Sequence, residues 1–201
     1  TWRRRSDAPS YTRACYNERV DYATYARAFL AHRAVAEVDA FTEIDEGVRR
    51  FPLLRARTPG HRRLLVTAGF HGDETAGPLT LLAYLPDLVR YARERDVGLD
   101  VYPCVNPSGF DARSRYNQVG ENPNNDFLRY EVEPGAWIDV LPIGTRFIRH
   151  EVFREGPRET RALLAELERL PLPVAALDIH QDPWTPGNLA YAYTLGARAP
   201  Y

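Results

Sequence analysis

Side chains that could do chemistry are concentrated in three short polar segments of this chain. They are HGDE at positions 71–74, NPSG at 106–109 and HQD at 180–182. His71 and Glu74 place an imidazole and a carboxylate three residues apart, and such a pair can supply nitrogen and oxygen ligands to one Zn²⁺ ion. A third ligand must come from elsewhere in the chain, so the pair by itself is a weak signal.

Each polar segment follows an apolar run that fits a buried strand, and these runs alternate with helical patterns. The runs are 64–70, 99–105 and 173–179. In the largely parallel sheet that this alternation predicts, the carboxyl ends of the strands lie along one edge, where ligands and catalytic groups gather. His71, Glu74 and His180 would then form a two-His, one-Glu set, which is the ligand count of a catalytic Zn²⁺ site that keeps one position open for water.

Each of these residues also has an ordinary structural interpretation. His71 could cap a helix or lie in a loop, Glu74 could be a first-turn carboxylate favoured by the helix dipole, and His180 could be a histidine at a strand end. Their joint placement at predicted strand ends favours the metal interpretation. Asp178 lies two residues before His180, so the two side chains share one face of a strand. Asp178 could orient a zinc-binding imidazole or bond to nearby backbone, and the sequence leaves both open.

Length and composition exclude several classes of protein. The 201 residues suffice for one domain with a sizeable core. A formal net charge of −1 gives no reason to expect nucleic acid or a membrane surface as partner. The sequence has no apolar run long enough to span a bilayer and no visible secretory signal, so a cytoplasmic location is expected. The two cysteines, Cys15 and Cys104, set no disulfide framework.

The hydrophobic pattern predicts the elements that position the polar segments. We expect an N-terminal helical segment over 1–50, which packs on a catalytic domain formed by 51–201. The predicted helices are 10–40, 79–92 and 159–170, and the predicted strands are 51–57, 62–70, 99–105, 173–179 and 189–195. The turn signal between the first two strands predicts a hairpin. Residues 110–129 have little periodicity, which is typical of a functional or disordered segment, and 131–157 show no clear pattern.

Together these features resemble the zinc carboxypeptidase family, in the superfamily that also contains the succinylglutamate desuccinylases and aspartoacylases. The matching pieces are FHGDETAG, NPSGF, the RYN segment and LDIHQD, which span roughly two thirds of the chain, from about 62 to 193. Their order is more specific than any single piece. The resemblance implies an α/β fold with a mixed, largely parallel, twisted sheet flanked by helices, and a zinc-dependent hydrolase that cleaves an amide or peptide bond.

The resemblance also implies roles for individual residues. His71, Glu74 and His180 are expected to bind Zn²⁺. Arg115 matches the family arginine that stabilises the oxyanion formed when water attacks the amide, a role that suits a fixed guanidinium aimed at developing negative charge. Arg113 is the substitute for it if the register slips by two residues, and Arg113, Asn124 and Asn125 are expected to contact the substrate.

Two departures from the family pattern bear on the function. Asn124 aligns with the family asparagine that helps to hold the substrate carboxylate, but Asn125 stands where the family usually has an arginine, and a neutral amide cannot form a charged bidentate clamp. The family's general base is a glutamate well beyond the third zinc ligand, whereas no glutamate follows Glu168 in this chain. We therefore expect the sequence to be incomplete at its C-terminus.

Three functions stay open on this basis. The first is a metallocarboxypeptidase-like enzyme that acts on a peptide. The second is an N-acyl-amino-acid deacylase or peptide amidase of the same superfamily, which Asn125 favours weakly. The third is a non-catalytic zinc-binding relative, because the general base is missing from these residues.

Overall fold

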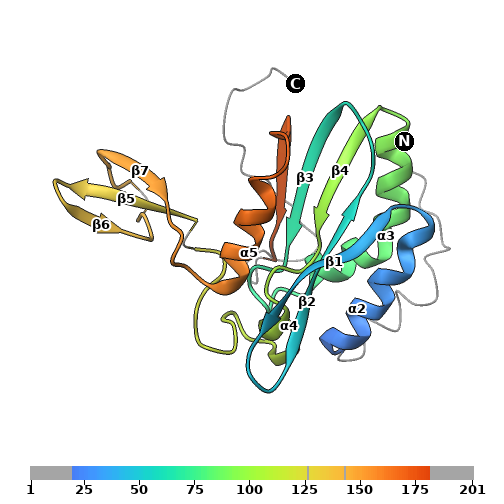
Figure 1. Cartoon of the computed structure of the whole chain (residues 1–201), viewed down its shortest axis with the longest axis horizontal. Coiled ribbons are helices and arrows are strands. Elements are labelled where there is room, and N and C mark those ends of the chain that lie inside the picture. Colours follow the sequence, from blue (N-terminus) through green and yellow to red (C-terminus); the bar gives the residue numbers. More distant parts are fainter. Residues whose placement is uncertain (1–19, 126, 143, 182–201) are drawn as a thin grey trace.

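The main body of the protein is a five-stranded mixed sheet with helices on both faces (Figure 1). The computed structural model describes residues 20–125, 127–142 and 144–181, so Cys15 and the strand expected at 189–195 lie outside it. The strand order is β1-β2-β4-β3-β8. These strands are β1 (Glu37–Asp45), β2 (Arg50–Arg57), β3 (Arg62–Ala68), β4 (Val97–Tyr102) and β8 (Ala175–Ile179).

The parallel part of the sheet is the part that carries the polar segments. β3 lies between β4 and β8 and pairs in parallel with both, whereas β1, β2 and β4 pair antiparallel. The α/β fold with a mixed sheet flanked by helices is therefore confirmed, although only half of the strand pairs are parallel. Because β3 and β8 run in the same direction, the residues that follow them leave the sheet at the same edge.

The hairpin predicted between 51–57 and 62–70 is wrong. β4 lies between β2 and β3, and β2 forms its hairpin with β1 instead. The turn of that hairpin contains Gly47, whose positive φ of 82° suits a tight connection. A turn signal shows where the chain reverses, but it does not show whether a later strand will be inserted between the two segments.

The helix predicted over 10–40 ends earlier than expected, and its first ten residues lie outside the described part of the chain. The structure has α2 over Tyr22–Leu30 and a 3₁₀ turn, η1, over Ala31–Ala34, and β1 follows. Asp21 caps α2 by accepting a hydrogen bond from the backbone N–H of Thr24 at 2.7 Å. Most positions of β1 at the sheet edge are exposed or half-buried, so the strand lacks a clear alternating pattern. The division of the chain at residue 50 stays a prediction.

Two cores pack on the two faces of the sheet. On one face, α2 and the 18-residue α3 (Ala76–Arg93) bury aromatic and leucine side chains, and α3 continues through Pro86. On the other face, α5 (Arg158–Leu167) buries Leu163 against Phe70 and Tyr102. Both amphipathic helices expected from the sequence are thus present, within a few residues of their predicted bounds. Among the described residues, no helix has the length and apolar character that a membrane crossing requires.

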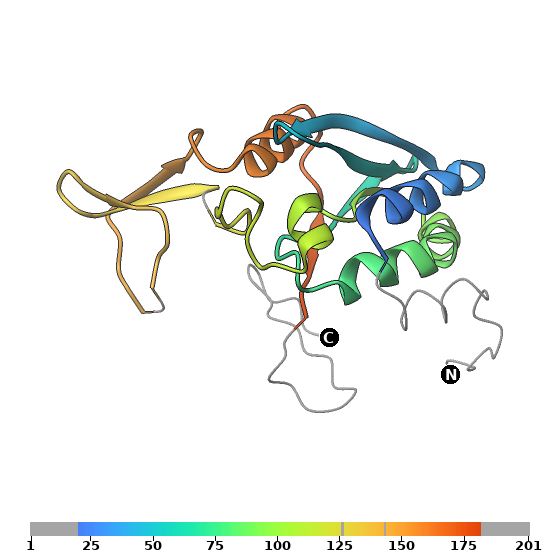
Figure 2. The same ribbon diagram turned by 90° about the horizontal axis from the view of Figure 1, so that it is seen from below.

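The segment without a clear sequence pattern forms a second, three-stranded sheet that projects from the main body (Figures 1 and 2). Its strands are β5 (Leu128–Glu133), β6 (Ala136–Ile138) and β7 (Arg149–Val152), in the order β6-β5-β7. At its root, the ring of Phe127 packs edge-on against Phe70, with the ring centroids 5.8 Å apart. The short helix α4 (Pro107–Ala112) begins in the NPSG motif after β4.

Candidate metal centre

The structure brings His71, Glu74 and His180 together at the carboxyl edge of the parallel strands. His71 follows β3, Glu74 lies in the turn that leads into α3, and His180 follows β8 directly. One candidate ligand atom from each residue lies within 4.8 Å of the other two. Residues that are 106 positions apart in the chain thus meet because β3 and β8 are parallel neighbours.

Two glycines shape the turn that carries His71. Gly69 has a φ of 67°, a conformation that glycine adopts without strain. Gly72 packs directly on α4, where an added Cβ would lie 1.9 Å from the carbonyl carbon of Gly109. Any side chain at position 72 would therefore push the His71 turn away from α4.

The Glu74 carboxylate is the common partner of both imidazoles. Nδ1 of His71 lies 2.6 Å from Oε1 of Glu74, and Nδ1 of His180 lies 2.8 Å from Oε2. The backbone N–H of Gln181 donates to the same Oε2 at 2.9 Å. His71 is buried, Glu74 is 13% exposed and His180 is 34% exposed at the side chain, so the group opens to solvent on the His180 side.

These contacts shift the pKa values of two members in opposite directions. Burial raises the pKa of Glu74, but hydrogen bonds from His180, His71 and the backbone of Gln181 outweigh it and hold that pKa well below its usual range. Hydrogen bonds to Asp178 and then Glu74 raise the pKa of His180 to about 10. Without a metal, this edge of the sheet therefore holds an ionised carboxylate beside a protonated imidazole.

The donor set fits a zinc ion. Two imidazole nitrogens and one carboxylate are ligands that zinc accepts, and three protein ligands leave a position for water. Nε2 of His71 is buried and has no hydrogen-bond partner among the described residues, so this ring is not fully satisfied by the protein. Nδ1 of both rings contacts the single carboxylate of Glu74, and a cation bound among these three side chains could contact all of them at once.

Asp178 holds the His180 ring from its other side. Oδ2 of Asp178 lies 2.8 Å from Nε2 of His180, and Oδ1 accepts a hydrogen bond from the hydroxyl of Thr67 at 2.8 Å. Of the two interpretations left open for Asp178, the structure therefore has the contact with the imidazole. The ring of His180 also stacks on Phe70, with centroids 6.4 Å apart.

The two candidate arginines point to different places. Nη1 of Arg115 lies 3.7 Å from Oε1 of Glu74, and its side chain is 48% exposed. Arg113 ends α4 and faces the opposite side, where it donates to the carbonyl of Val20 and lies over the ring of Phe110. The geometry therefore favours Arg115 over Arg113 as the guanidinium beside the metal ligands.

Asn124 and Asn125 lie in a turn before the second sheet. Their backbone N–H groups donate to the side chain and the carbonyl of Asn122, respectively. Both residues are half-buried, and within the described ranges no side-chain hydrogen bond links either of them to the ligand group. Their assignment to substrate binding stays a prediction.

Gln181 and Asn106 lie in two of the polar segments found in the sequence, but no role at this site was predicted for either of them. Gln181 contributes its backbone N–H to Glu74, and its side chain accepts a hydrogen bond from the N–H of Ala76 at 3.3 Å. The side-chain amide of Asn106 donates to the backbone carbonyls of Phe70 and Arg115. Its position before a proline, where it caps α4, was the available signal, since asparagine is a preferred N-cap.

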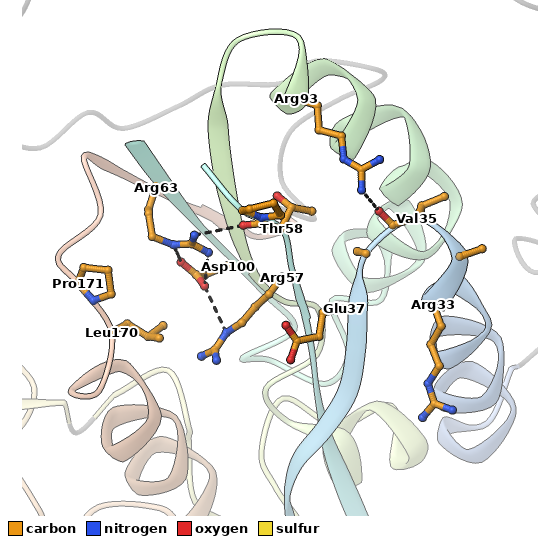
Figure 3. A pocket seen from close by; sticks show the side chains of 13 residues that line it. Arg33, Val35, Glu37, Arg57, Thr58, Arg63, Arg93, Asp100, Leu170 and Pro171 are labelled. Carbon is orange, nitrogen blue, oxygen red and sulfur yellow. Dashed lines mark hydrogen bonds and ion pairs between the residues drawn. The ribbon is translucent and has the colours of Figure 1, made fainter. Parts of the chain in front are cut away.

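A second region with many charges lies near the amino end of β3, whereas the candidate metal ligand His71 follows the other end of that strand. Figure 3 shows the side chains of this region. It is a pocket of about 680 Å³. Its lining includes four arginines together with Glu37 and Asp100, and these arginines are Arg33, Arg57, Arg63 and Arg93. Arg63 forms a bidentate pair with Asp100 at 2.6 and 2.8 Å. Arg93 donates to the carbonyl of Val35 at 2.6 Å, so these guanidinium groups are already engaged by the protein.

Comparisons with known proteins found one matching family model and several similar solved structures. Residues 60–135 match the family model of the succinylglutamate desuccinylase/aspartoacylase catalytic domain. No curated protein sequence matches the chain.

Several solved structures share the fold. A candidate metallopeptidase from Shewanella amazonensis SB2B is 29% identical, with a TM-score of 0.54 over 81% of this chain and 56% of its own. Bovine thrombin-activatable fibrinolysis inhibitor, solved with tick carboxypeptidase inhibitor, is 17% identical, with a TM-score of 0.56 over 80% of this chain and 58% of its own. The chain thus spans little more than half of each structure. The resemblance predicted from the sequence is confirmed by these matches.

Proposed function

We propose that this chain, as part of the superfamily that joins metallocarboxypeptidases with succinylglutamate desuccinylases and aspartoacylases, forms the metal-binding part of a zinc-dependent hydrolase of amide bonds. The observation that carries the proposal is the meeting of His71, Glu74 and His180 at one edge of the sheet. Arg115 lies beside them, as the chemistry requires.

His71, Glu74 and His180 would hold the metal. When bound, a zinc ion supplies a water ligand with a pKa of roughly 7 and polarises the carbonyl that is attacked. The contact of Asp178 with Nε2 of His180 fixes the ring so that Nδ1 faces Glu74. Each ligand is thereby held in place before a substrate arrives.

Arg115 would stabilise the negative charge that develops on the substrate carbonyl oxygen. A guanidinium keeps its charge at all working pH values, and its exposed side chain can reach a substrate that enters from solvent. Nη1 of Arg115 lies 3.7 Å from Oε1 of Glu74, so the guanidinium lies beside the proposed metal ligands. Such a donor is worth about 100- to 1,000-fold in kcat.

Two substrate classes deserve a direct comparison. The likeness to a candidate metallopeptidase structure favours a peptide substrate. The match of residues 60–135 favours an N-acyl amino acid, and so does Asn125, which cannot clamp a carboxylate as an arginine does. We place the deacylase as the second candidate on these grounds.

The test is a comparison of substrates and variants in the full-length protein loaded with zinc. Arg115→Ala should lower kcat by about 100-fold or more and leave zinc content unchanged, while Arg113→Ala should change kcat by less than about 2-fold. Peptides with free and amidated C-termini, beside N-acyl amino acids, separate the two substrate classes. Stoichiometric zinc without turnover of any amide would instead support the non-catalytic relative.

A further inference from the structure

Asn106 is a fully buried polar residue whose side chain joins three separate backbone segments. Its Oδ1 accepts a hydrogen bond from the N–H of Gly109 at 2.9 Å and so caps α4. Its Nδ2 donates to the carbonyl of Phe70 at 3.2 Å and to the carbonyl of Arg115 at 3.3 Å. The reversed amide would place an oxygen against two carbonyl oxygens, so these partners fix its orientation.

The two carbonyls that share this amide belong to the two halves of the proposed active site. Phe70 directly precedes the ligand His71, and its ring stacks on the ligand His180. Arg115 is the proposed oxyanion donor. Asn106 is thus a bridge between the turn that carries a metal ligand and the segment that carries the guanidinium.

The surroundings of Asn106 leave its side chain little freedom. Its backbone N–H donates to the carbonyl of Gly69 at 2.8 Å. Gly109 packs so closely that an added Cβ would lie 2.5 Å from Nδ2 of Asn106. The amide therefore holds its two carbonyl partners rigidly, as a buried and fully paired polar group does.

We propose that Asn106 is the positioning residue that fixes Arg115 relative to the metal ligands. This inference rests on the proposed function, in which Arg115 acts on the substrate oxygen. Arg115 is half-exposed and lies at the edge of ion-pair distance from Glu74, so a weak contact alone would not fix the guanidinium. The buried bond from Asn106 supplies the missing restraint at the backbone of Arg115.

The test is a double-mutant cycle between positions 106 and 115 in the full-length zinc protein. Asn106→Ser keeps an oxygen that can cap α4 but lacks the amide donor for both carbonyls. Because a misplacement of about 1 Å can cost 100-fold, we expect kcat to fall by about 10- to 100-fold, with zinc content and KM near wild type. In the Arg115→Ala background the same substitution should change kcat by less than about 2-fold, since the group that Asn106 positions is gone.

Thr58→Val is the matched control. Thr58 is also buried, and its hydroxyl accepts a hydrogen bond from the N–H of Leu99 at 3.0 Å. Leu99 pairs with Leu64 near the amino end of β3, at the other end of that strand from the candidate metal ligands. This control should lower the melting temperature by a similar amount and leave kcat within about 2-fold. The proposal would be overturned if the effects of Asn106→Ser and Arg115→Ala on kcat multiplied in the double mutant. Loss of zinc in Asn106→Ser would overturn it as well.

A second measurement keeps the inference testable if the protein turns over no amide, which would defeat the proposed function by itself. The Nε–H resonance of Arg115 in ¹⁵N NMR can be identified because Arg115→Lys removes it. We expect this resonance to move or broaden in Asn106→Ser and to stay in place in Thr58→Val. An unchanged resonance in Asn106→Ser would show that Asn106 does not position Arg115.

Discussion

The metal-ligand group and the arginine-lined pocket both concentrate charged side chains, but they distribute their partners differently. In the pocket region, Asp100 faces Arg63 and Arg57, and Glu166 faces Arg55 and Arg57. At the candidate metal-ligand edge, a single carboxylate serves two imidazoles and a backbone N–H.

Because the charges of the pocket are paired within the chain, a local excess of charge is weak evidence for a ligand site. Around the pocket, three arginines are balanced by Asp39, Asp100 and Glu166, so the charges are satisfied within the chain and hold β2, β3, β4 and α5 together. At the carboxyl edge the donor atoms converge without such balance. The convergence of candidate ligand atoms from three residues, rather than the number of charges, marks the place where a cation would fit.

The largest effect should follow the loss of the shared carboxylate. Glu74→Gln keeps the shape of the side chain but removes the negative ligand, so zinc affinity should fall by roughly 1,000-fold or more, beyond the 10- to 100-fold typical of an outer-shell change. Metal analysis and competition titration measure this. Asp73→Asn is the control, because Asp73 lies in the same turn and is exposed. A stoichiometric zinc ion in Glu74→Gln would contradict the metal centre.

The complementary substitution in the pocket should cost stability and spare the metal. Asp100→Asn leaves Arg63 and Arg57 beside a neutral amide, and breaking a buried pair costs about 3 kcal/mol, or roughly 6–12 °C in melting temperature. Zinc content should not change. Asp87→Asn is the control: it breaks a pair with Arg90 in which both side chains are about two thirds exposed, and it should cost less than about 1 kcal/mol. Loss of zinc from Asp100→Asn would show that the charges of the pocket also support metal binding, which would contradict the separate roles of the two regions.

The sequence predicted the parts of the fold that have strong local patterns. The helices α3 and α5 were found because their apolar residues recur at helical spacing. The strands β3 and β8 were found because each is a short apolar run, although β8 is exposed or half-buried along its whole length. β1 was missed because its sequence, EVDAFTEID, mixes charged and apolar residues and forms no apolar run. The pairing of β2 was wrong because strand order depends on contacts far apart in the chain. The second sheet was missed because β7 is exposed at every position and therefore shows no buried apolar run.

For the candidate site, the sequence predicted which residues meet but not how they are held. His71 and His180 could be paired because each follows an apolar run in an alternating pattern. The bridge from Asn106 to Arg115 could not be predicted, because it depends on the close contact between Gly72 and α4 and on the orientation of a buried amide. Asp178 could be predicted in part. Strand geometry placed it on the same face as His180, but only the structure shows that its carboxylate contacts the ring.

A smaller effect on the metal should come from Asp178. Asp178→Asn keeps an acceptor but removes the charge that orients His180, so zinc affinity should fall by about 10- to 100-fold. Thr67→Val is the control, because it removes the other hydrogen bond of Asp178 and should cost less than about 10-fold. Equal affinities in wild type and Asp178→Asn, measured by competition titration, would show that the carboxylate has no part in the metal site.

Glu159 extends the comparison to a third arrangement of charge. This carboxyl is fully buried at the start of α5, and Nδ2 of Asn117 lies 3.2 Å from its Oε2. Burial raises its pKa, and the negative charges of Glu46 and Glu121 add to that rise, whereas Asn117 and its own backbone N–H oppose it. In the pocket each buried carboxylate faces an arginine, but Glu159 faces an amide and two charges of its own sign.

The smallest predicted effect is therefore a pH dependence. Because the pKa of Glu159 is higher in the folded than in the unfolded chain, its contribution to stability is complete below the unfolded pKa and is lost as pH rises through the folded one. Glu159→Gln removes this dependence, so in zinc-free protein the variant should match wild type near about pH 4 and exceed it by about 1 kcal/mol near about pH 7. Denaturant unfolding across that range measures the difference, with the exposed Glu94→Gln as control. If the free energy of unfolding varied with pH in the same way in wild type and Glu159→Gln, then Glu159 would be ionised in the folded protein without loss of stability. In that case it would behave like the paired carboxylates of the pocket.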